Sequence, residues 1–310
     1  MVPVLVRAAR RRLTAFALVG AAGVALAGCA NGSPPPGVVA AVGAESQYAN
    51  VIAQVGGRYV AVTSVIANPA TDPHAYEAST SVARAVAGAR LVVQNGLGYD
   101  AFMSQLESAS ASSSRRVLVA ARLMGRPAAT RNPHLWYDPA TMSHVAAAVA
   151  HALTVIEPSH SAYFARRLRA FDAATGSLAA QIATFRSRFA HQPVAVTEPV
   201  ANYLLAALGL RVVTPFRLQA AVMNGVDPSP QDVAAARAVL AGHAVRLLAY
   251  NAQVASPVTD AIRAQARTAG VPVVAFYETM PVGFTYQSWM RAEIAALTRA
   301  LASGASTRSL

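Results

Sequence analysis

The sequence feature that most constrains the fold is a row of large apolar side chains at helical spacing between Ser159 and Phe189. Phenylalanine, leucine and isoleucine recur there at steps of three and four residues, while the arginines of the same stretch lie off the apolar row. This pattern predicts one amphipathic helix. At 1.5 Å per residue, the helix would be roughly 45 Å long, which is longer than one small lobe needs. It fits a bridge between two lobes better than a coiled-coil dimer, because aromatic side chains occupy the apolar row.

Short β-rich runs alternate with alanine-rich helical stretches on both sides of this helix. The predicted strands lie at residues 38–42, 60–66, 91–94 and 117–120 before it, and at 194–197, 211–214, 245–250 and 271–277 after it. Strands that alternate with helices indicate parallel βαβ units. The sequence therefore predicts an α/β protein of two βα lobes with parallel sheets, joined by one long rigid backbone helix. We place the N-terminal lobe at 38–157, the linking helix at 158–190, the C-terminal lobe at 191–304 and a tail at 305–310.

The first residues are typical of a secretory signal. Four arginines precede the apolar run Leu13 to Ala27, which at about 15 residues is short for a membrane span. The segment Leu26-Ala27-Gly28-Cys29 resembles the lipobox of bacterial lipoproteins, in which the chain is cut before the cysteine and its thiol is lipidated. We therefore expect a signal peptide at 1–28 and a lipidated Cys29 with a tether at 29–37. The protein would then lie outside the cytoplasm, anchored to the membrane by lipid.

The charge of the chain excludes one class of partner. Its formal charge is +12, and the four arginines of the signal segment account for part of it, so the mature chain keeps +8. The remaining arginines are scattered, with few aromatic residues among them, which argues against nucleic-acid binding. Attraction to an anionic membrane surface is the interpretation that remains. Cys29 is the single cysteine, so the chain has no disulfide framework.

Four residues that can bind a metal ion follow predicted strands. Ligand groups in open α/β sheets gather at the carboxyl ends of strands. His74 and His134 occupy such places in the first lobe, and Glu198 and Glu278 come directly after apolar strands in the second. The two glutamates also fit the start of a helix, where the helix dipole favours an acid. An unpaired carboxylate after a buried strand is costly, however, and a bound cation removes that cost, so we expect a metal site in the inter-lobe cleft.

Several segments resemble the solute-binding lipoproteins of ABC transporters that import zinc or manganese, the ZnuA- and TroA-like family. The likeness extends over nearly the whole mature chain and includes the long helix and the segments Asp72-Pro73-His74-Ala75-Tyr76-Glu77, Gln94-Asn95-Gly96-Leu97-Gly98, Asn132 to Pro139 and Asp227-Pro228-Ser229-Pro230. The resemblance implies that His74 and His134 are the first two metal ligands. The third position falls on Glu198. The fourth, usually an aspartate, is best placed at Glu278, with Asn251 or a water molecule as substitutes.

The predicted ligand set bears on the choice of metal. Two imidazoles with two carboxylates favour manganese more than three imidazoles with one carboxylate would, although zinc has the higher general affinity. The stretch before His134 also lacks the histidine- and acid-rich loop of many zinc-type members. The expected cargo is Mn²⁺ or Zn²⁺, with Fe²⁺ as a third choice. Around the ligands we expect Asn95, Trp136 and Asn251, with Trp136 and Tyr137 packed against the imidazole of His134.

The resemblance implies a binding protein rather than an enzyme. It would act as a monomer that captures one metal ion and delivers it to an ABC permease and its ATPase. A secreted metallohydrolase, with Glu77 or Asp138 as general base, is one alternative, but four protein ligands leave no position for an activated water. A surface adhesin that shares the fold is a second alternative. A binder of a metal chelate such as a siderophore is a third, which would need a roomy aromatic cleft.

Overall fold

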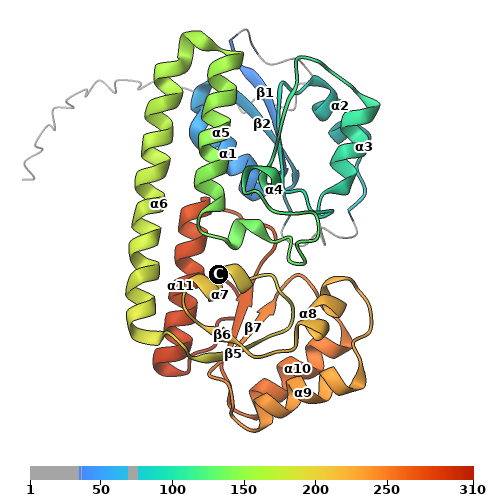
Figure 1. Cartoon of the computed structure of the whole chain (residues 1–310), viewed down its shortest axis with the longest axis vertical. Helices are drawn as coiled ribbons and strands as arrows, with labels where there is room; N and C mark the ends of the chain where they lie inside the picture. Colours follow the sequence, from blue (N-terminus) through green and yellow to red (C-terminus); the bar gives the residue numbers. More distant parts are fainter. Residues whose placement is uncertain (1–34, 36, 69–75) are drawn as a thin grey trace, which may run out of the picture. The chain divides into compact units, whose positions relative to one another are not determined.

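The protein is described by a computed structural model, which covers residues 35, 37–68 and 76–310. The predicted signal peptide, the lipidation site Cys29 and the candidate ligand His74 lie outside these residues. Within them, two α/β lobes lie beside one long helix (Figure 1). No helix in the described part of the chain is long and apolar enough to cross a membrane.

The N-terminal lobe is built on a parallel sheet with strand order β2-β1-β3-β4. Its strands are β1 (Val39–Glu45), β2 (Val60–Ile66), β3 (Leu91–Gln94) and β4 (Arg116–Val119). Its helices are α1 (Ser46–Gly56), α2 (Thr80–Gly88), α3 (Ala101–Ala109), α4 (Ala120–Leu123) and α5 (Thr141–Ile156). The β3 strand is fully buried, as expected for a parallel sheet covered by helices.

The long helix α6 (Ser161–Phe189) confirms the prediction from its apolar row. It runs for 29 residues after a 3-10 turn at Pro158–His160. The residues that it buries are those of the row: Phe164, Phe171, Thr175, Leu178, Ile182 and Phe185. It packs on α1 and α5 of the first lobe and on α11 (Tyr286–Ser303) of the second, so it spans both lobes (Figure 1).

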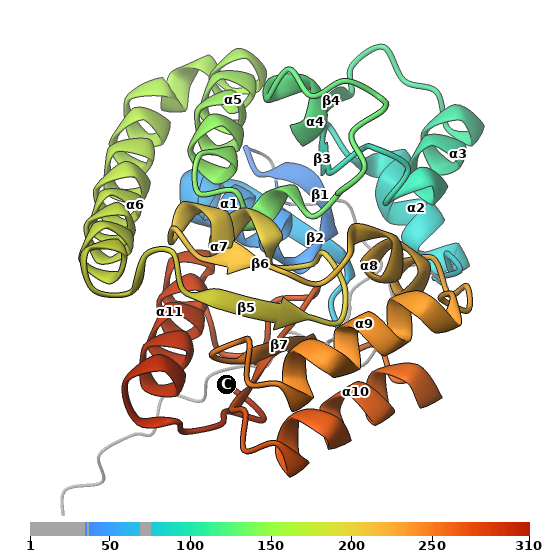
Figure 2. The same ribbon diagram turned by 60° about the horizontal axis from the view of Figure 1, so that its bottom comes forward.

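The C-terminal lobe repeats the sheet topology of the first. Its parallel sheet has the order β6-β5-β7-β8, with strands β5 (Pro193–Val196), β6 (Arg211–Val212), β7 (Leu248–Asn251) and β8 (Val273–Phe276). Besides α11, its helices are α7 (Asn202–Ala207), α8 (Phe216–Met223), α9 (Pro230–Ala241) and α10 (Pro257–Thr268). Figure 2 shows α9 and α10 side by side over this sheet. Helix α9 is capped by Ser229, whose side chain accepts a hydrogen bond from the Asp232 N–H.

Several element bounds differ from the prediction. β1 ends at Glu45 rather than at residue 42, β7 begins at Leu248 rather than at residue 245, and β6 ends at Val212 rather than at Thr214. The sequence pattern did not predict the short helices α4 and α8. The Thr214 hydroxyl accepts a hydrogen bond at 2.8 Å from the Val196 N–H, so a side chain takes the place of a ladder carbonyl where β5 ends. The chain then turns at Pro215 into α8, which buries Leu218 and Val222 at helical spacing.

One cluster of buried apolar side chains continues from one lobe into the other. It includes Tyr48 of α1, the 3-10 turn Leu135–Tyr137, Phe276 of β8 and Trp289 of α11. The loops that follow β4 and β8 therefore meet at the centre of the molecule. This places the carboxyl ends of the two sheets opposite each other, where the candidate metal ligands lie.

Candidate metal site

The loop after β4 holds His134 in a fixed position. His134 is fully buried, and the edge of Trp136 lies against its ring with centroids 5.3 Å apart. The ring of Tyr99 packs on it at 5.7 Å. Pro133 precedes it and restricts the backbone, and the 3-10 turn Leu135–Tyr137 follows directly. The imidazole is therefore positioned by packing before any ion arrives.

The side chain of Asn132 sets the tautomer of His134. Its Oδ1 accepts the backbone N–H of His134 at 3.1 Å, and its Nδ2 donates to the carbonyl of Pro199 at 2.9 Å, which fixes the orientation of the amide. The same Oδ1 lies 2.8 Å from His134 Nδ1. Since this oxygen can only accept, Nδ1 carries the proton. In the neutral ring Nε2 then holds the lone pair, which is the arrangement of a metal-ligating histidine.

The loop after β8 brings the Glu278 carboxylate to this imidazole. Its Oε2 lies 3.6 Å from His134 Nε2, and both side chains are fully buried. Tyr99 donates to Oε2 at 2.8 Å, and Asn251 Nδ2 donates to Oε1 at 2.6 Å. Burial, followed by the charge of Glu278, raises the pKa of Tyr99 well above its usual value, so the phenol keeps its proton. The carboxylate is thus held by one donor from each lobe.

The backbone of the loop that carries Glu278 is held by hydrogen bonds from both lobes. Gln253 Oε1 accepts the N–H groups of Glu278 and Thr279. From the first lobe, Gln47 Nε2 donates to the Glu278 carbonyl at 3.2 Å, and the Ser46 hydroxyl accepts the Met280 N–H at 3.0 Å. The junction of β1 and α1 therefore supports the loop that carries Glu278.

Glu198 occupies the corresponding place after β5. It is 1% exposed and directly precedes Pro199, whose carbonyl accepts the Asn132 amide. The turn that carries Glu198 is therefore tied to the loop that carries His134. The backbone N–H of Asn251 donates to Thr197 Oγ1 at 3.3 Å, which links the turn that carries Glu198 to β7. The side-chain amide of the same Asn251 donates to the Glu278 carboxylate.

The structure brings His134 and Glu278 together as a pair. Among the described residues, no group of three or more histidine, cysteine, aspartate or glutamate side chains is arranged to hold a metal ion. His74 lies outside those residues, so the four-ligand set stays a prediction. His144 and His160 lie in other contacts: Nδ1 of His144 is 2.9 Å from the Ala140 carbonyl, and the ring of His160 stacks on Tyr59.

The residues predicted to surround the ligands lie at this pair. Asn95 donates to the Pro133 carbonyl at 2.8 Å and accepts from the Tyr48 hydroxyl at 2.7 Å. Trp136 packs on the imidazole, and Asn251 binds Glu278. Sequence reasoning missed Asn132 and Tyr99, because neither follows a strand directly. Asn132 acts on His134 within the same loop, and Tyr99 contacts Glu278 from the other lobe.

Two buried acids beside the site were also missed. Glu45 ends β1 and is fully buried, and neither carboxyl oxygen has a hydrogen-bond partner among the described residues. Burial, with a smaller effect of Asp100, raises the pKa of Glu45 well above its usual value. Burial likewise raises the pKa of Asp100 to about 6, although its Oδ1 accepts the Gly96 N–H at 2.9 Å. An acid at the end of an apolar strand, the signal that selected Glu198, also marks Glu45.

Comparisons with known proteins agree with the two-lobed fold. A family model described as ZnuA, the periplasmic component A of a zinc-uptake complex, matches residues 42–300. Among solved structures, the chain is similar to the periplasmic zinc-binding protein TroA from Treponema pallidum, with 20% identity and a TM-score of 0.72, covering 86% of this chain and 100% of that one. No curated protein matches the chain.

Two further solved structures have the same fold. One is the solute-binding protein FpvC from Pseudomonas aeruginosa in complex with Mn²⁺, with 19% identity, a TM-score of 0.71, and coverage of 86% of this chain and 99% of that one. The other is a mutant of the laminin-binding adhesin Lmb from Streptococcus agalactiae, with 20% identity, a TM-score of 0.71, and coverage of 85% and 99%. At these identities the likeness concerns the fold.

Proposed function

The chain belongs to the family of periplasmic zinc-uptake components whose model matches residues 42–300, and from this premise we propose that it captures one divalent transition-metal ion and delivers it to an ABC permease. The observation that supports capture at the predicted place is the buried pair of His134 and Glu278. An imidazole nitrogen from one lobe and a carboxylate from the other lie 3.6 Å apart at the meeting point of the two sheets. A cation between them would be bound by both lobes at once.

The proposed ligands are His74, His134, Glu198 and Glu278. The Asn132 contact supports His134, because it leaves the Nε2 lone pair for a metal. The two glutamates would offset the two positive charges of the ion, which favours binding in a buried place. Because Tyr99 and Asn251 already orient the Glu278 carboxylate, little ordering remains when the ion binds.

The proposed cargo is Mn²⁺ or Zn²⁺, with Fe²⁺ as a third choice. Two imidazoles and two carboxylates accept either of the first two ions. TroA is described as zinc-binding and FpvC was solved with Mn²⁺, so proteins of this fold are described with both metals. The chemistry of the ligand set therefore keeps both ions as candidates.

We further propose that the mature protein is a monomer held at the outer face of the membrane by lipid on Cys29. The support is the lipobox-like segment after a short apolar run, followed by a stretch of proline, glycine and serine. Docking on the permease and its ATPase would then take place at the membrane surface. The +8 charge of the mature chain favours an anionic surface.

Two of the three rival functions, the metallohydrolase and the adhesin, gain no support at the site. A metallohydrolase needs a general base, but Asp138 accepts a hydrogen bond from Arg126 at 2.6 Å and another from the Ala140 N–H at 3.1 Å. Those contacts engage the carboxylate away from proton transfer. The adhesin alternative rests on the fold shared with Lmb, and no described feature of this chain adds to it.

Metal titration of the mature chain tests the proposal. The protein, stripped of metal, should bind one equivalent of Mn²⁺ or Zn²⁺ in a saturable manner, and competition between the two ions would rank them. His134→Ala should weaken binding by at least about 100-fold, since loss of a mere supporting contact already costs about 10–100-fold. The matched control is His144→Ala, an exposed histidine on α5, which should bind as the natural protein does. Absence of saturable binding would refute the proposed function.

A further inference from the structure

The strands of the N-terminal sheet all begin at one edge, and the chain that leads back to Cys29 leaves the lobe from this edge. The sheet is parallel throughout, so the amino ends of its strands lie together, opposite the carboxyl ends that lead to the candidate metal site. β1 begins at Val39, which pairs with Val60 at the start of β2. Cys29 lies ten residues before Val39, a length of chain that spans at most about 36 Å. A lipid on Cys29 would therefore keep this edge close to the membrane.

An arginine stands at or just before the start of each of the other three strands. Arg58 lies two residues before β2, Arg90 directly precedes β3, and Arg116 is the first residue of β4. All three are exposed. Glu157 pairs with Arg90 at 3.1 Å, but in the part of the chain that the structure describes neither Arg58 nor Arg116 forms a salt bridge. The edge therefore presents two positive charges that no acid offsets.

An aromatic cluster at the start of α6 adds a further positive charge to this edge. The ring of Tyr59 stacks on His160 with centroids 3.7 Å apart and meets the ring of Tyr163 edge-on at 4.9 Å. Arg58 and Arg166 both lie over the Tyr163 ring, at 5.5 and 5.3 Å from its centroid. Figure 1 shows the start of α6 and the start of β1 at the same end of the molecule. Tyrosine rings beside guanidinium groups suit the interface between a membrane and water, where the rings lie at the level of the headgroups.

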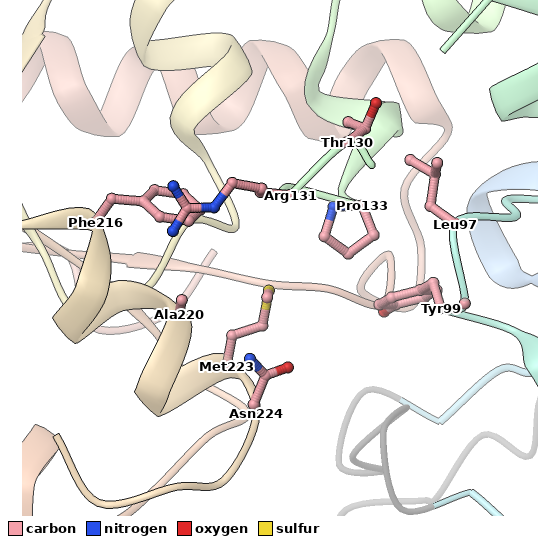
Figure 3. A pocket seen from close by; sticks show the side chains of 10 residues that line it. Leu97, Tyr99, Thr130, Arg131, Pro133, Phe216, Ala220, Met223 and Asn224 are labelled. Atoms are coloured by element: carbon pink, nitrogen blue, oxygen red, sulfur yellow. The ribbon is translucent and has the colours of Figure 1, made fainter. Parts of the chain in front are cut away.

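The carboxyl ends of the strands use arginine differently. Arg131, in the loop after β4, lies over the ring of Phe216 of α8 at 4.2 Å and lines a pocket of about 420 Å³ between the lobes (Figure 3). This guanidinium packs on a ring of the other lobe. Arg58 and Arg166 instead pack on rings of their own edge. Arg131 therefore joins the two lobes, whereas the arginines at the amino ends belong to one exposed surface of the first lobe.

We propose that the amino edge of the N-terminal sheet, with Arg58, Arg116 and Arg166, rests on anionic phospholipid headgroups of the membrane that holds Cys29. Guanidinium groups donate well to phosphate oxygens, and the tether brings the two surfaces within reach. β1 is seven residues long, so the metal site lies about 20 Å further from the lipid and stays clear of the headgroups. This inference rests on the proposed lipid anchor, and it names the surface that the anchored protein turns towards the membrane.

Vesicle binding of the mature chain without its lipid tests the inference. The chain should sediment with vesicles that contain phosphatidylglycerol and not with vesicles of phosphatidylcholine alone, and added salt should weaken the binding. One arginine at an anionic surface contributes about fivefold in affinity, so Arg116→Ala combined with Arg166→Ala should weaken vesicle binding by about 25-fold.

A matched double variant removes the same charge elsewhere. Arg211 is the first residue of β6, as Arg116 is of β4, and Arg188 lies over Phe189 at 4.8 Å near the end of α6. Arg188 is about 33 Å along the helix from Arg166, which is several times the screening length of about 8 Å at physiological salt. Arg188→Ala combined with Arg211→Ala should therefore change vesicle binding by less than about twofold.

Metal titration of the same samples separates this inference from the proposed function. The natural chain and both double variants should bind one equivalent of Mn²⁺ or Zn²⁺ alike, because no substitution lies at the metal site. No binding of the natural chain to anionic vesicles, or equal losses in the two double variants, would overturn the inference and leave metal capture standing. Loss of metal binding by the natural chain would instead refute the proposed function. Mass spectrometry of the protein isolated from membranes reports the lipid on Cys29, and its absence would refute the anchor and this inference with it.

Discussion

The two lobes have the same strand order but present different side chains at equivalent places. When the strands of each sheet are numbered along the chain, their order across the sheet is second, first, third, fourth in both lobes. The first strand leads to a buried acid in both lobes: Glu45 is the last residue of β1, and Glu198 follows the end of β5. The loop after the fourth strand supplies His134 in one lobe and Glu278 in the other. No sequence repeat relates the lobes, so the equivalence lies in the topology alone.

We propose that the acids at equivalent positions of the two lobes have different roles, with Glu198 but not Glu45 as a metal ligand. Glu45 has no hydrogen-bond partner for its carboxyl oxygens among the described residues, and burial raises its pKa, so its neutral form is favoured. Glu198 stands in a turn that Asn132 ties to His134. In the loops after the fourth strands, the imidazole of His134 faces the carboxylate of Glu278. The pair offers a metal ion one nitrogen ligand and one oxygen ligand. On this proposal, the strand ends of both lobes provide positions for metal ligands, and the contacts of each side chain determine whether it binds the ion.

The strongest test of this contrast compares Glu278 with Glu45. Glu278→Ala should weaken metal binding by at least about 100-fold, because it removes a ligand and also leaves Tyr99 and Asn251 without their acceptor. Glu45→Ala removes an equally buried acid and should change metal affinity by less than about tenfold. Titration calorimetry with Mn²⁺ and Zn²⁺ measures both. Equal losses in the two variants would mean that Glu45 takes part in binding.

The two first-strand acids provide a narrower test. Glu198→Gln keeps the shape of the side chain and removes its charge, so affinity should fall by about 10–100-fold if the carboxylate binds the ion. Glu45→Gln should leave metal affinity nearly unchanged, because burial raises the pKa of Glu45 and so favours its neutral form, which contributes no charge. Competition with a metal-sensitive dye measures the two variants side by side. A larger loss of metal affinity in Glu45→Gln than in Glu198→Gln would mean that Glu45, and not Glu198, is the metal ligand.

The sequence predicted those parts of the molecule that depend on local pattern. The apolar row predicted α6, and alternating strands and helices predicted both sheets, because burial of a periodic face shows directly in the residue order. The helix α8 was missed, since its boundary depends on the Thr214 contact with β5. Asn132 was missed although His134, which it contacts, is only two residues away, because a contact within a loop follows no helical or strand period. Tyr99 was missed because its partner Glu278 is distant in sequence. Long-range pairs of this kind leave no periodic signal along the chain.

A smaller effect is expected from the residue that sets the His134 tautomer. Asn132→Ala removes the acceptor of the Nδ1 proton and should weaken metal binding by about tenfold. Asn132→Asp keeps an acceptor for Nδ1 and should bind metal more tightly than the alanine variant, although it loses the donor to the Pro199 carbonyl. Proton–nitrogen NMR of the imidazole reports the tautomer directly. Unchanged affinity in Asn132→Ala would show that packing by Trp136 and Tyr99 is sufficient to orient the ring.

The smallest effect concerns stability and separates Glu45 from the metal ligands. Because burial raises the pKa of Glu45 in the folded state, the folded chain holds a proton that the unfolded chain releases once the pH exceeds the usual glutamate value. The natural protein should therefore lose stability as the pH rises above about 4.5. Glu45→Gln lacks this group, so its melting temperature should exceed that of the metal-free natural protein by more at pH 8 than at pH 4. A difference that is constant with pH would mean that Glu45 is ionised in the folded protein and has a counter-charge, which would make it resemble Glu198 after all.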